Sequence, residues 1–190
     1  TPLVIYARAN TKGLHVRGFY PYIQYWVHLG YTVIAPQVRG SAGLGKQYEF
    51  LNYGDWGGGD IDDFAYGAYY LAEKGLIDLD KVVMQGGSTG GYFVLAMTFR
   101  YPDLLSAAVC FYGCPDLLHT WSHRSGTSRP VLGDVVGGDR GGPDMAPEHW
   151  TGRSAIYNLE KINTPTLLLW GDRDGVRPSH ADDYYRAAKD

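Results

Sequence analysis

The sequence predicts an α/β protein built on a mostly parallel sheet, and three observations lead to this class. Five short β-branched or apolar segments show little alternation, which is typical of strands covered on both faces. Helix-like segments lie between them, and such alternation favours parallel strands joined by right-handed crossovers. One strand–helix junction, Gly86-Gly-Ser-Thr-Gly90, is rich in glycine and carries a serine. This junction is the feature of the chain that points most directly to a function.

The elements follow one another along the chain in a regular order. The expected strands are Leu3–Ala7, Thr32–Val38, Lys81–Gln85, Ala107–Phe111 and Thr166–Trp170. The expected helices are Tyr22–Leu29, Asp60–Glu73, Gly91–Arg100 and Ser179–Lys189. Ligands of such sheets bind at the carboxyl ends of the strands. Residues 119–153 are polar, rich in Gly and Pro and weakly periodic, so we expect a long insertion that overhangs this edge.

Composition bounds the class of protein and its partners. A chain of 190 residues with 45% hydrophobic and 19% charged residues supports one globular domain. The net charge of −3 argues against nucleic acid as the main partner. No apolar run approaches ~18 residues, so no membrane span is expected. The first residues have a strand pattern and the last have a helical pattern, as in the interior of a fold. We therefore expect a piece of a longer protein, and the sequence does not indicate its cellular compartment.

Ser88 stands at the corner of a strand–turn–helix, the arrangement that exposes a nucleophilic serine. Strand and helix pass close together there, so side chains two residues before and after the serine would clash, and Gly86 and Gly90 occupy those places. The Thr89 N–H would open the helix and could stabilise an oxyanion. The alternative is an ordinary serine in a glycine-rich turn.

An activated serine needs a base, and the base needs an orienting carboxylate. Asp172 and Asp174 both follow the strand Thr166–Trp170, and either could serve or simply cap its own turn. Of the six histidines, only His180 follows these aspartates. It opens the last helix, where we expect a surface residue, and a base from the next strand–loop unit would lie beyond residue 190.

Two further patterns could indicate other functions. Gly40-Ser-Ala-Gly-Leu-Gly-Lys46 resembles a nucleotide-binding loop, but Gln47 stands where a magnesium-binding Ser or Thr is needed. Asp60, Asp62 and Asp63 could suggest a metal site, although acidic residues in a first helical turn offset the helix dipole. We therefore expect no metal and no cofactor.

The only cysteines are Cys110 and Cys114, whose spacing matches no metal or redox motif. We expect two reduced thiols, at least one of them buried.

Five stretches, in order over almost the whole chain, resemble the catalytic domain of the prolyl oligopeptidase family of serine peptidases. They are Val38–Gly45, Gly54–Asp63, Gly86–Tyr92, Tyr101–Asp103 and Thr164–Asp174. The resemblance implies an α/β-hydrolase fold and a Ser-Asp-His triad with Ser88 as nucleophile. It implies that residues 1–190 form an incomplete catalytic domain, truncated at both ends, without the family's β-propeller and without the segment that carries the histidine.

The resemblance also implies roles for individual residues. The family's aspartate usually stands three residues after the glycine that ends its strand, which selects Asp174. Its second oxyanion donor is often a tyrosine after the first strand, and Tyr6 holds that position in Tyr6–Asn10. Where the family usually has glycines next, this chain has Ala7, Arg8 and Ala9.

A substrate pocket is expected beside Ser88, with Tyr112, Trp121 and Val176 as walls because they follow strand ends near the elbow. The expected substrate is a short peptide, cleaved through an acyl-enzyme on Ser88, and the protein could form a homo-oligomer. Two alternatives stay open because fold does not settle substrate. One is a carboxylesterase on the same fold, and the other is a non-catalytic binding module.

Overall fold

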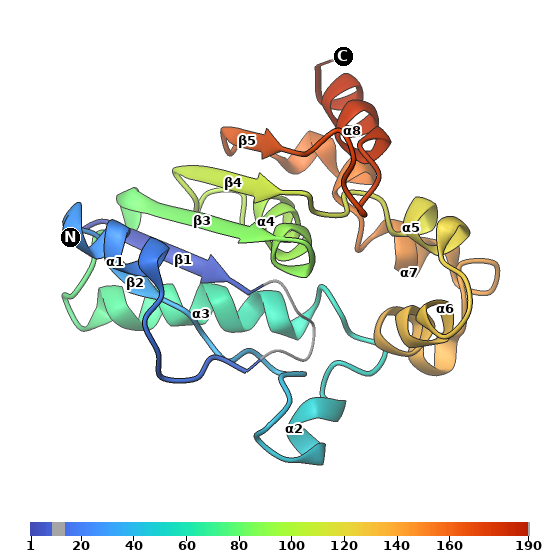
Figure 1. Cartoon of the computed structure of the whole chain (residues 1–190), viewed down its shortest axis with the longest axis horizontal. Coiled ribbons are helices and arrows are strands. Elements are labelled where there is room, and N and C mark those ends of the chain that lie inside the picture. The colour runs from blue at the N-terminus through green and yellow to red at the C-terminus, as the bar shows by residue number, and fades with distance from the viewer. Residues whose placement is uncertain (9–13, 190) are drawn as a thin grey trace.

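Five parallel strands form one sheet in the order β2-β1-β3-β4-β5 in the computed structural model, which describes residues 1–8 and 14–189. The strands are β1 Leu3–Ala7, β2 Thr32–Ile34, β3 Val82–Gly87, β4 Ala107–Phe111 and β5 Thr166–Leu169. All four strand pairs are parallel. The predicted α/β class with a parallel sheet is therefore confirmed, and the carboxyl ends of the strands gather at one edge (Figure 1).

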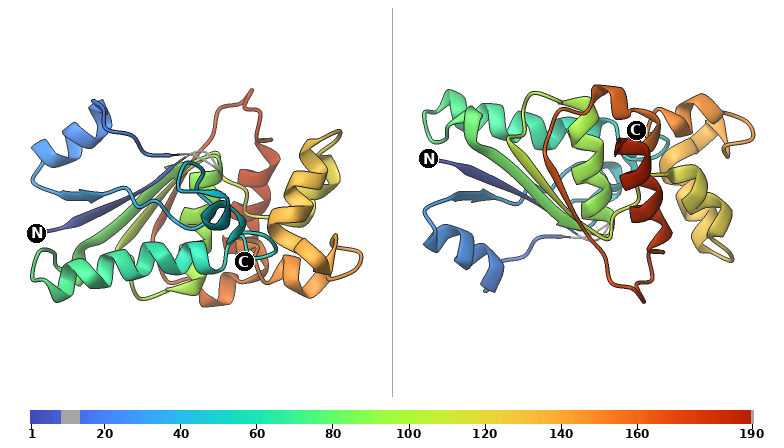
Figure 2. Two further views of the ribbon diagram at one scale, coloured as in Figure 1. Left: turned by 90° about the horizontal axis from the view of Figure 1, so that it is seen from below. Right: turned by 90° about the horizontal axis from the view of Figure 1, so that it is seen from above.

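Helices cover both faces of the sheet, as expected. They are α1 Pro21–His28, α2 Lys46–Phe50, α3 Gly59–Glu73, α4 Thr89–Arg100, α5 Leu117–His123, α6 Ser128–Leu132, α7 Pro147–Thr151 and α8 Ser179–Lys189. Single turns of 3₁₀ or π helix fill Leu79–Lys81, Gly133–Gly137, Gly138–Arg140, Ala155–Tyr157 and Leu159–Lys161. Helix α1 lies on one face, and α3, α4 and α8 lie on the other (Figure 2).

The structure shortens two of the expected strands. Strand β2 ends at Ile34 and not at Val38, because Pro36 has no N–H to donate to a neighbouring strand. The outermost strand, β5, ends at Leu169, and its side chains are less covered than expected: Leu167 and Leu169 are 55% and 41% exposed. Full cover on both faces is thus restricted to the central strands.

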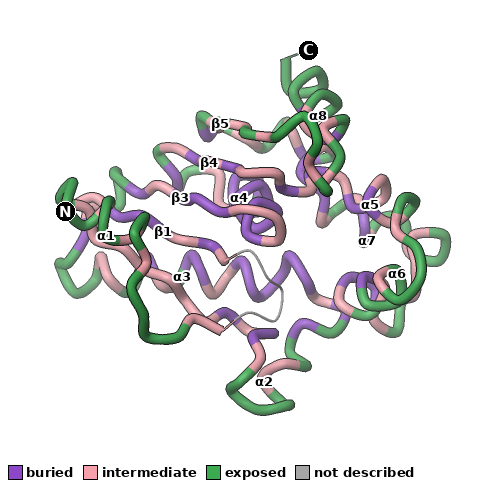
Figure 3. The backbone as a smooth tube through the Cα atoms, viewed as in Figure 1, coloured by how far each residue is buried: buried purple, intermediate pink, exposed green. Residues whose placement is uncertain are grey.

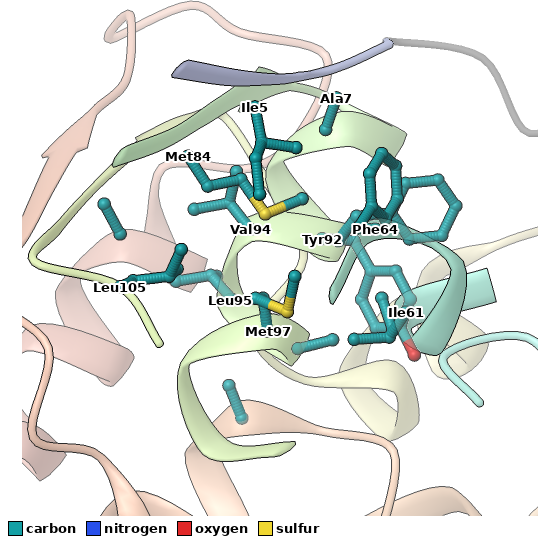
Figure 4. Close-up of a cluster of buried hydrophobic side chains, with 14 of the residues drawn as sticks. Ile5, Ala7, Ile61, Phe64, Met84, Tyr92, Val94, Leu95, Met97 and Leu105 are labelled. Atoms are coloured by element: carbon teal, nitrogen blue, oxygen red, sulfur yellow. The ribbon is translucent and has the colours of Figure 1, made fainter. Parts of the chain in front are cut away.

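Helix α4 is the centre of the core, and it is buried from Gly90 to Phe99 (Figure 3). Its Tyr92, Leu95 and Met97 lie in the same buried cluster as Ile5 and Met84 of the sheet and Phe64 of α3 (Figure 4). Burying each large apolar side chain contributes roughly 1.5–3 kcal/mol. The helix that follows the Ser88 elbow is therefore held on both sides, by the sheet and by α3.

The expected insertion contains short helices that its weak periodicity does not predict. Helices α5, α6 and α7 have five to seven residues each, too few to be stable alone. Tertiary contacts hold them, as where Trp121 packs edge-on against the buried Trp150 at 5.1 Å. The arrowheads of β3 and β4 point toward this insertion (Figure 1), so it stands over the carboxyl edge of the sheet.

A buried carboxylate joins the loop before α3 to the first turn of that helix. The Asp60 carboxylate is fully buried and accepts hydrogen bonds from Asn52 Nδ2 at 3.2 Å, Gly57 N at 3.2 Å and Ile61 N at 2.9 Å. Burial raises the pKa of Asp60 to about 7, against the effect of the two backbone hydrogen bonds. Asp60 therefore titrates near neutral pH while it holds this loop together.

The close approach at the elbow gives a first prediction. A Cβ at Gly86 would lie 2.6 Å from the Gly90 carbonyl and 2.7 Å from Ala7 O, so Gly86→Ala should lower the free energy of unfolding by about 1–3 kcal/mol. Gly67→Ala, inside helix α3, is the matched control. The added Cβ would lie 3.5 Å from Ile34 Cδ1, its nearest neighbour, which is an ordinary contact distance. This substitution should be neutral or stabilise by about 0.5–1 kcal/mol. Equal urea midpoints for the two variants would contradict this account.

Asp60 gives a second prediction, on pH. Its pKa is higher in the folded state than the ordinary 3.8, so the folded state binds more protons than the unfolded state between about pH 4 and pH 7. The contribution of Asp60 to stability is therefore present below about pH 4 and is lost as pH rises through about 7, by an amount on the order of 4 kcal/mol.

Asp60→Asn should remove this pH dependence, whatever it does to stability at one pH. Urea unfolding at about pH 5 and about pH 8 would show a smaller difference in unfolding free energy than in the wild type. Asp172→Asn, at an exposed carboxylate, is the control. A wild-type pH dependence retained in Asp60→Asn would show that another group is responsible.

Candidate active site

Ser88 forms the corner between β3 and α4, and its backbone is in an unusual conformation. Its φ is 54° and its ψ is −120°, a region that costs a non-glycine residue about 1–3 kcal/mol. Two hydrogen bonds hold it: Ser88 N–H donates to Phe111 O at 3.0 Å, and Tyr92 N–H donates to Ser88 O at 3.0 Å. A strained, well-held serine at a strand–helix corner is the geometry expected of a nucleophile elbow.

The expected glycine requirement around Ser88 is confirmed by the packing. A Cβ at Gly90 would collide with Ala7 O, and one at Gly91 would lie 2.7 Å from Gly113 Cα and from Phe111 O. Real Cβ atoms do not come that near to backbone atoms. The elbow is thus pressed against both neighbouring strands, β1 and β4, which fixes where Ser88 projects.

The Thr89 amide, which the sequence suggests as an oxyanion donor, is the first N–H of helix α4. Helix α4 begins at Thr89, with Ser88 at its N-cap. The first N–H groups of a helix have no partner inside the helix, and the helix dipole adds partial positive charge there. Ser88 and Thr89 are both half-buried and so remain accessible. Thr89 N–H is therefore available to an oxygen of a group that reacts at Ser88.

A pocket of about 380 Å³ opens beside the elbow on the α1 face of the sheet. Gly87, immediately before Ser88, and Tyr112 both line it, and a Cβ at Gly87 would lie 2.8 Å from the Tyr112 hydroxyl. The other lining residues are mainly aromatic: Tyr6, Tyr22, Tyr25, Trp26, Gln85, Gly86 and Phe111. The α1 residues of this pocket were not predicted from the sequence, although Tyr22, Tyr25 and Trp26 share one helical face by their spacing.

Tyr6 lies at this pocket, but its hydroxyl is engaged. It donates to the Tyr22 hydroxyl at 3.0 Å, and the two rings are 4.8 Å apart. Burial, followed by this hydrogen bond, raises the pKa of Tyr6 well above its ordinary value, so the phenol stays protonated. To serve an oxyanion, Tyr6 would exchange its partner Tyr22 for the substrate oxygen. The residues that follow in the expected oxyanion loop, Ala9 and Asn10, lie outside the described residues.

The other two expected pocket walls lie elsewhere. Trp121 lines a separate pocket of about 450 Å³ inside the insertion, together with Arg124 and Arg129, because its ring is packed on Trp150. Val176 is half-buried, its N–H donates to Asp174 Oδ1 at 2.8 Å, and it lines neither pocket. Of the three predicted walls, the structure brings only Tyr112 to the pocket beside Ser88.

Asp174 lies in the loop between β5 and α8, at the same edge of the sheet as Ser88. Its Oδ1 accepts the Val176 N–H, which orients the carboxylate, and it is half-buried while Asp172 is exposed. Neighbouring strands are ~4.8 Å apart, so the ends of β3 and β5 are separated by about 10 Å. A base between nucleophile and carboxylate would occupy that interval.

The histidines are placed as follows. The His15 ring is 5.8 Å from Tyr6, His28 is exposed on α1, and His149 Nε2 makes a 2.7 Å hydrogen bond with Val136 O. His119, His123 and His180 form a cluster between α5 and α8. The expectation that His180 lies on the surface is wrong: it is only 5% exposed, because its side of α8 packs against α5.

The three aspartates at the start of α3 are either buried, as Asp60 is, or paired with arginines. Asp62 pairs with Arg100 at 2.7 Å, and Asp63 pairs with Arg39 at 2.7 Å. Over residues 1–8 and 14–189, no group of three or more histidine, cysteine, aspartate or glutamate side chains could hold a metal ion. Across the same residues, no helix is long and apolar enough to cross a membrane.

Both cysteines are free thiols, and Cys110 is buried, which confirms the expectation for them. Burial raises the pKa of Cys110 to about 12, so this thiol stays neutral.

Comparison with known proteins agrees with this geometry. The sequence model of the prolyl oligopeptidase family (Peptidase_S9) matches residues 17–189. Dipeptidyl aminopeptidase BIII of Pseudoxanthomonas mexicana is 27% identical over 189 residues, which cover 98% of this chain and 27% of that protein. The acylamino-acid-releasing enzyme of Rattus norvegicus is 25% identical, over 99% of this chain and 26% of that protein.

Solved structures show the same fold. A crystal structure of puromycin hydrolase superimposes with a TM-score of 0.91 at 25% identity, covering 98% of this chain and 28% of that one. An acylaminoacyl peptidase in complex with a chloromethyl ketone superimposes with a TM-score of 0.87 at 20% identity. The chain thus spans about a quarter of the length of these relatives.

The five-stranded parallel sheet, the strand–turn–helix at Ser88 and the superposition on puromycin hydrolase define an α/β-hydrolase fold. More narrowly, this chain belongs to the prolyl oligopeptidase family.

Proposed function

We propose that this chain carries the nucleophile of a serine peptidase that cleaves short peptides through an acyl-enzyme. The observation that carries the proposal is the left-handed Ser88 at the β3–α4 corner, next to the free N-terminus of α4. The names of the relatives, dipeptidyl aminopeptidase and acylamino-acid-releasing enzyme, favour an amide substrate. An aromatic pocket beside Gly87 would accept an apolar side chain of that substrate.

In the proposed mechanism, Ser88 Oγ attacks the scissile carbonyl and gives its proton to a histidine base. Asp174 holds that histidine in its productive tautomer. The oxyanion that forms is stabilised by Thr89 N–H and, after release from Tyr22, by the Tyr6 hydroxyl. The protonated base then gives its proton to the leaving amine, and water hydrolyses the resulting ester on Ser88.

The base is proposed to come from the complete protein, outside residues 1–190. His15 lies against Tyr6 of β1, on the opposite side of β3 from β5 and the Asp174 loop. The other five histidines lie on the outside of α1, against Val136, or in the α5–α8 cluster.

Ser88→Ala tests the nucleophile in the complete protein. The wild type should react with a fluorophosphonate probe, and the variant should not, because the probe bonds to an activated serine oxygen. Labelling followed by peptide mapping gives the site. Ser106→Ala, at a serine whose hydroxyl donates to Val82 O at 2.9 Å, is the control and should label normally. Retained labelling of Ser88→Ala would exclude Ser88, and an unlabelled wild type would favour a non-catalytic module.

Substrate class is tested by comparing turnover of an aminoacyl amide with that of a short-chain p-nitrophenyl ester. A peptidase should hydrolyse both. Turnover of the ester alone would replace the peptidase proposal with the carboxylesterase alternative.

Tyr6→Phe tests the second oxyanion donor. Losing one donor should lower kcat by roughly 10²–10³-fold with little change in KM. Tyr101→Phe is the matched control, because it removes a tyrosine hydroxyl that donates to Asp62 Oδ1 at 2.8 Å beyond the C-terminal end of α4 and leaves the proposed donor in place, so kcat should not fall. Steady-state kinetics on one amide substrate gives both numbers, and an unchanged kcat for Tyr6→Phe would remove Tyr6 from the site.

A further inference from the structure

Three imidazoles meet between α5 and α8, and the proposed mechanism uses none of them. His119 and His123 lie one turn apart on α5, with ring centroids 4.2 Å apart. His180, in the first turn of α8, packs on His119 with centroids 4.3 Å apart. Helix α5 opens the insertion over the active-site edge, whereas α8 follows the loop that carries Asp174. The cluster therefore joins these two parts of the site.

His180 is one of the two residues through which α8 packs on the rest of the fold. The helix has two buried residues, His180 and Tyr184, which lie one turn apart on the same face. Tyr184 belongs to the main core, but His180 packs on another imidazole, and its buried Nδ1 has no hydrogen-bond partner among the described residues. A leucine could fill such a place without a buried polar atom. What the imidazole adds is the capacity to take up a proton.

The Asp174 loop joins β5 to α8, and its internal hydrogen bonds, Asp174 N–H to Gly171 O at 3.3 Å and Val176 N–H to Asp174 Oδ1 at 2.8 Å, connect loop residues to one another. At the β5 end, Tyr112 N–H donates to Leu169 O at 2.8 Å. At the α8 end, His180 N–H donates to Arg177 O at 3.0 Å. The residues between are exposed or half-buried. A shift of the first turn of α8 would therefore carry the Asp174 loop with it.

The surroundings of the cluster favour neutral imidazoles. Burial, and then the neighbouring His119, lower the pKa of His180 to about 4. Burial, and then His123, lower the pKa of His119. Asp116 and Asp183 act in the opposite direction on both rings, and Arg177 acts with the histidines on His119. The Asp116 carboxylate also caps α5, accepting Leu118 N–H at 2.8 Å.

We propose that His180 is a positioning residue: packed in its neutral form on His119, it holds the first turn of α8 and the Asp174 loop, and protonation of the cluster releases that loop. The role of Asp174 in this statement rests on the proposed function. The buried His180–His119 contact, the continuation of the loop into α8 and the three imidazoles do not.

The direction of the pH effect follows from the lowered pKa. A released loop exposes His180, whose pKa then returns toward the ordinary 6.5. Above about pH 6.5, the free-energy difference that favours the packed loop over the released loop is fully present. It decreases as pH falls from there toward about 4, because the released form then binds more protons. The released form should therefore accumulate only in acid.

Hydrogen exchange with mass spectrometry on the complete protein tests this directly. Between about pH 7 and about pH 4, after correction for the intrinsic exchange rate, wild-type peptides covering 171–184 should lose protection by at least about tenfold. His180→Leu should lose much less, because leucine fills the contact and cannot be charged. His28→Gln, at an exposed histidine of α1, should behave like the wild type. Equal acid-induced losses in wild type and His180→Leu would overturn the proposal.

A second variant covers the case in which His180→Leu does not fold. His119→Leu keeps His180 but removes its neighbouring imidazole, so the acid-induced loss should be smaller than in the wild type. A loss equal to that of the wild type would again overturn the proposal. Fluorophosphonate labelling of the wild type tests the proposed function separately, since hydrogen exchange at residues 171–184 requires no activity.

Discussion

The close approach of β3, α4 and the ends of β1 and β4 is the constraint on which the rest of this structure depends. Gly86 and Gly90 leave room for the Ala7 carbonyl, and Gly91 leaves room for Phe111 O and Gly113. Only because no side chain intervenes can the chain turn within one residue, in a conformation that costs about 1–3 kcal/mol. The core around α4 offsets that cost, since it buries the helix from Gly90 to Phe99.

This constraint also organises the edge of the sheet. With the elbow pressed on both neighbouring strands, Tyr6 at the end of β1 and Tyr112 after β4 come to the same pocket. Tyr92, in the first turn of α4, stacks on Trp56 at 4.1 Å and donates to Arg153 O at 3.1 Å. The Ser88 elbow is thus supported from the sheet, from the loop before α3 and from the end of the insertion.

Family membership rests on the sequence match along the chain, whereas the candidate site rests on the local geometry of a few residues. The family match covers residues 17–189, and the match to the solved fold covers 98% of the chain. The roles of Ser88, Thr89, Asp174 and Tyr6 remain proposals. Their strength differs with their surroundings: Ser88 and Thr89 are held by backbone geometry, whereas Tyr6 must leave its hydrogen bond with Tyr22 and Asp174 lies in a largely exposed loop.

The sequence alone determined the strand–helix alternation, the bounds of β1, β4 and α8, and the serine elbow, because short-range patterns and the steric needs of glycine express these features locally. It could not decide that Trp121 packs on Trp150, that α1 supplies aromatic residues to the pocket, or that His180 is buried. Those outcomes depend on which residues distant in the chain meet in space. From the sequence, a polar side chain near the end of the chain, such as His180, is expected to be exposed. It is buried because the fold places His119 against it.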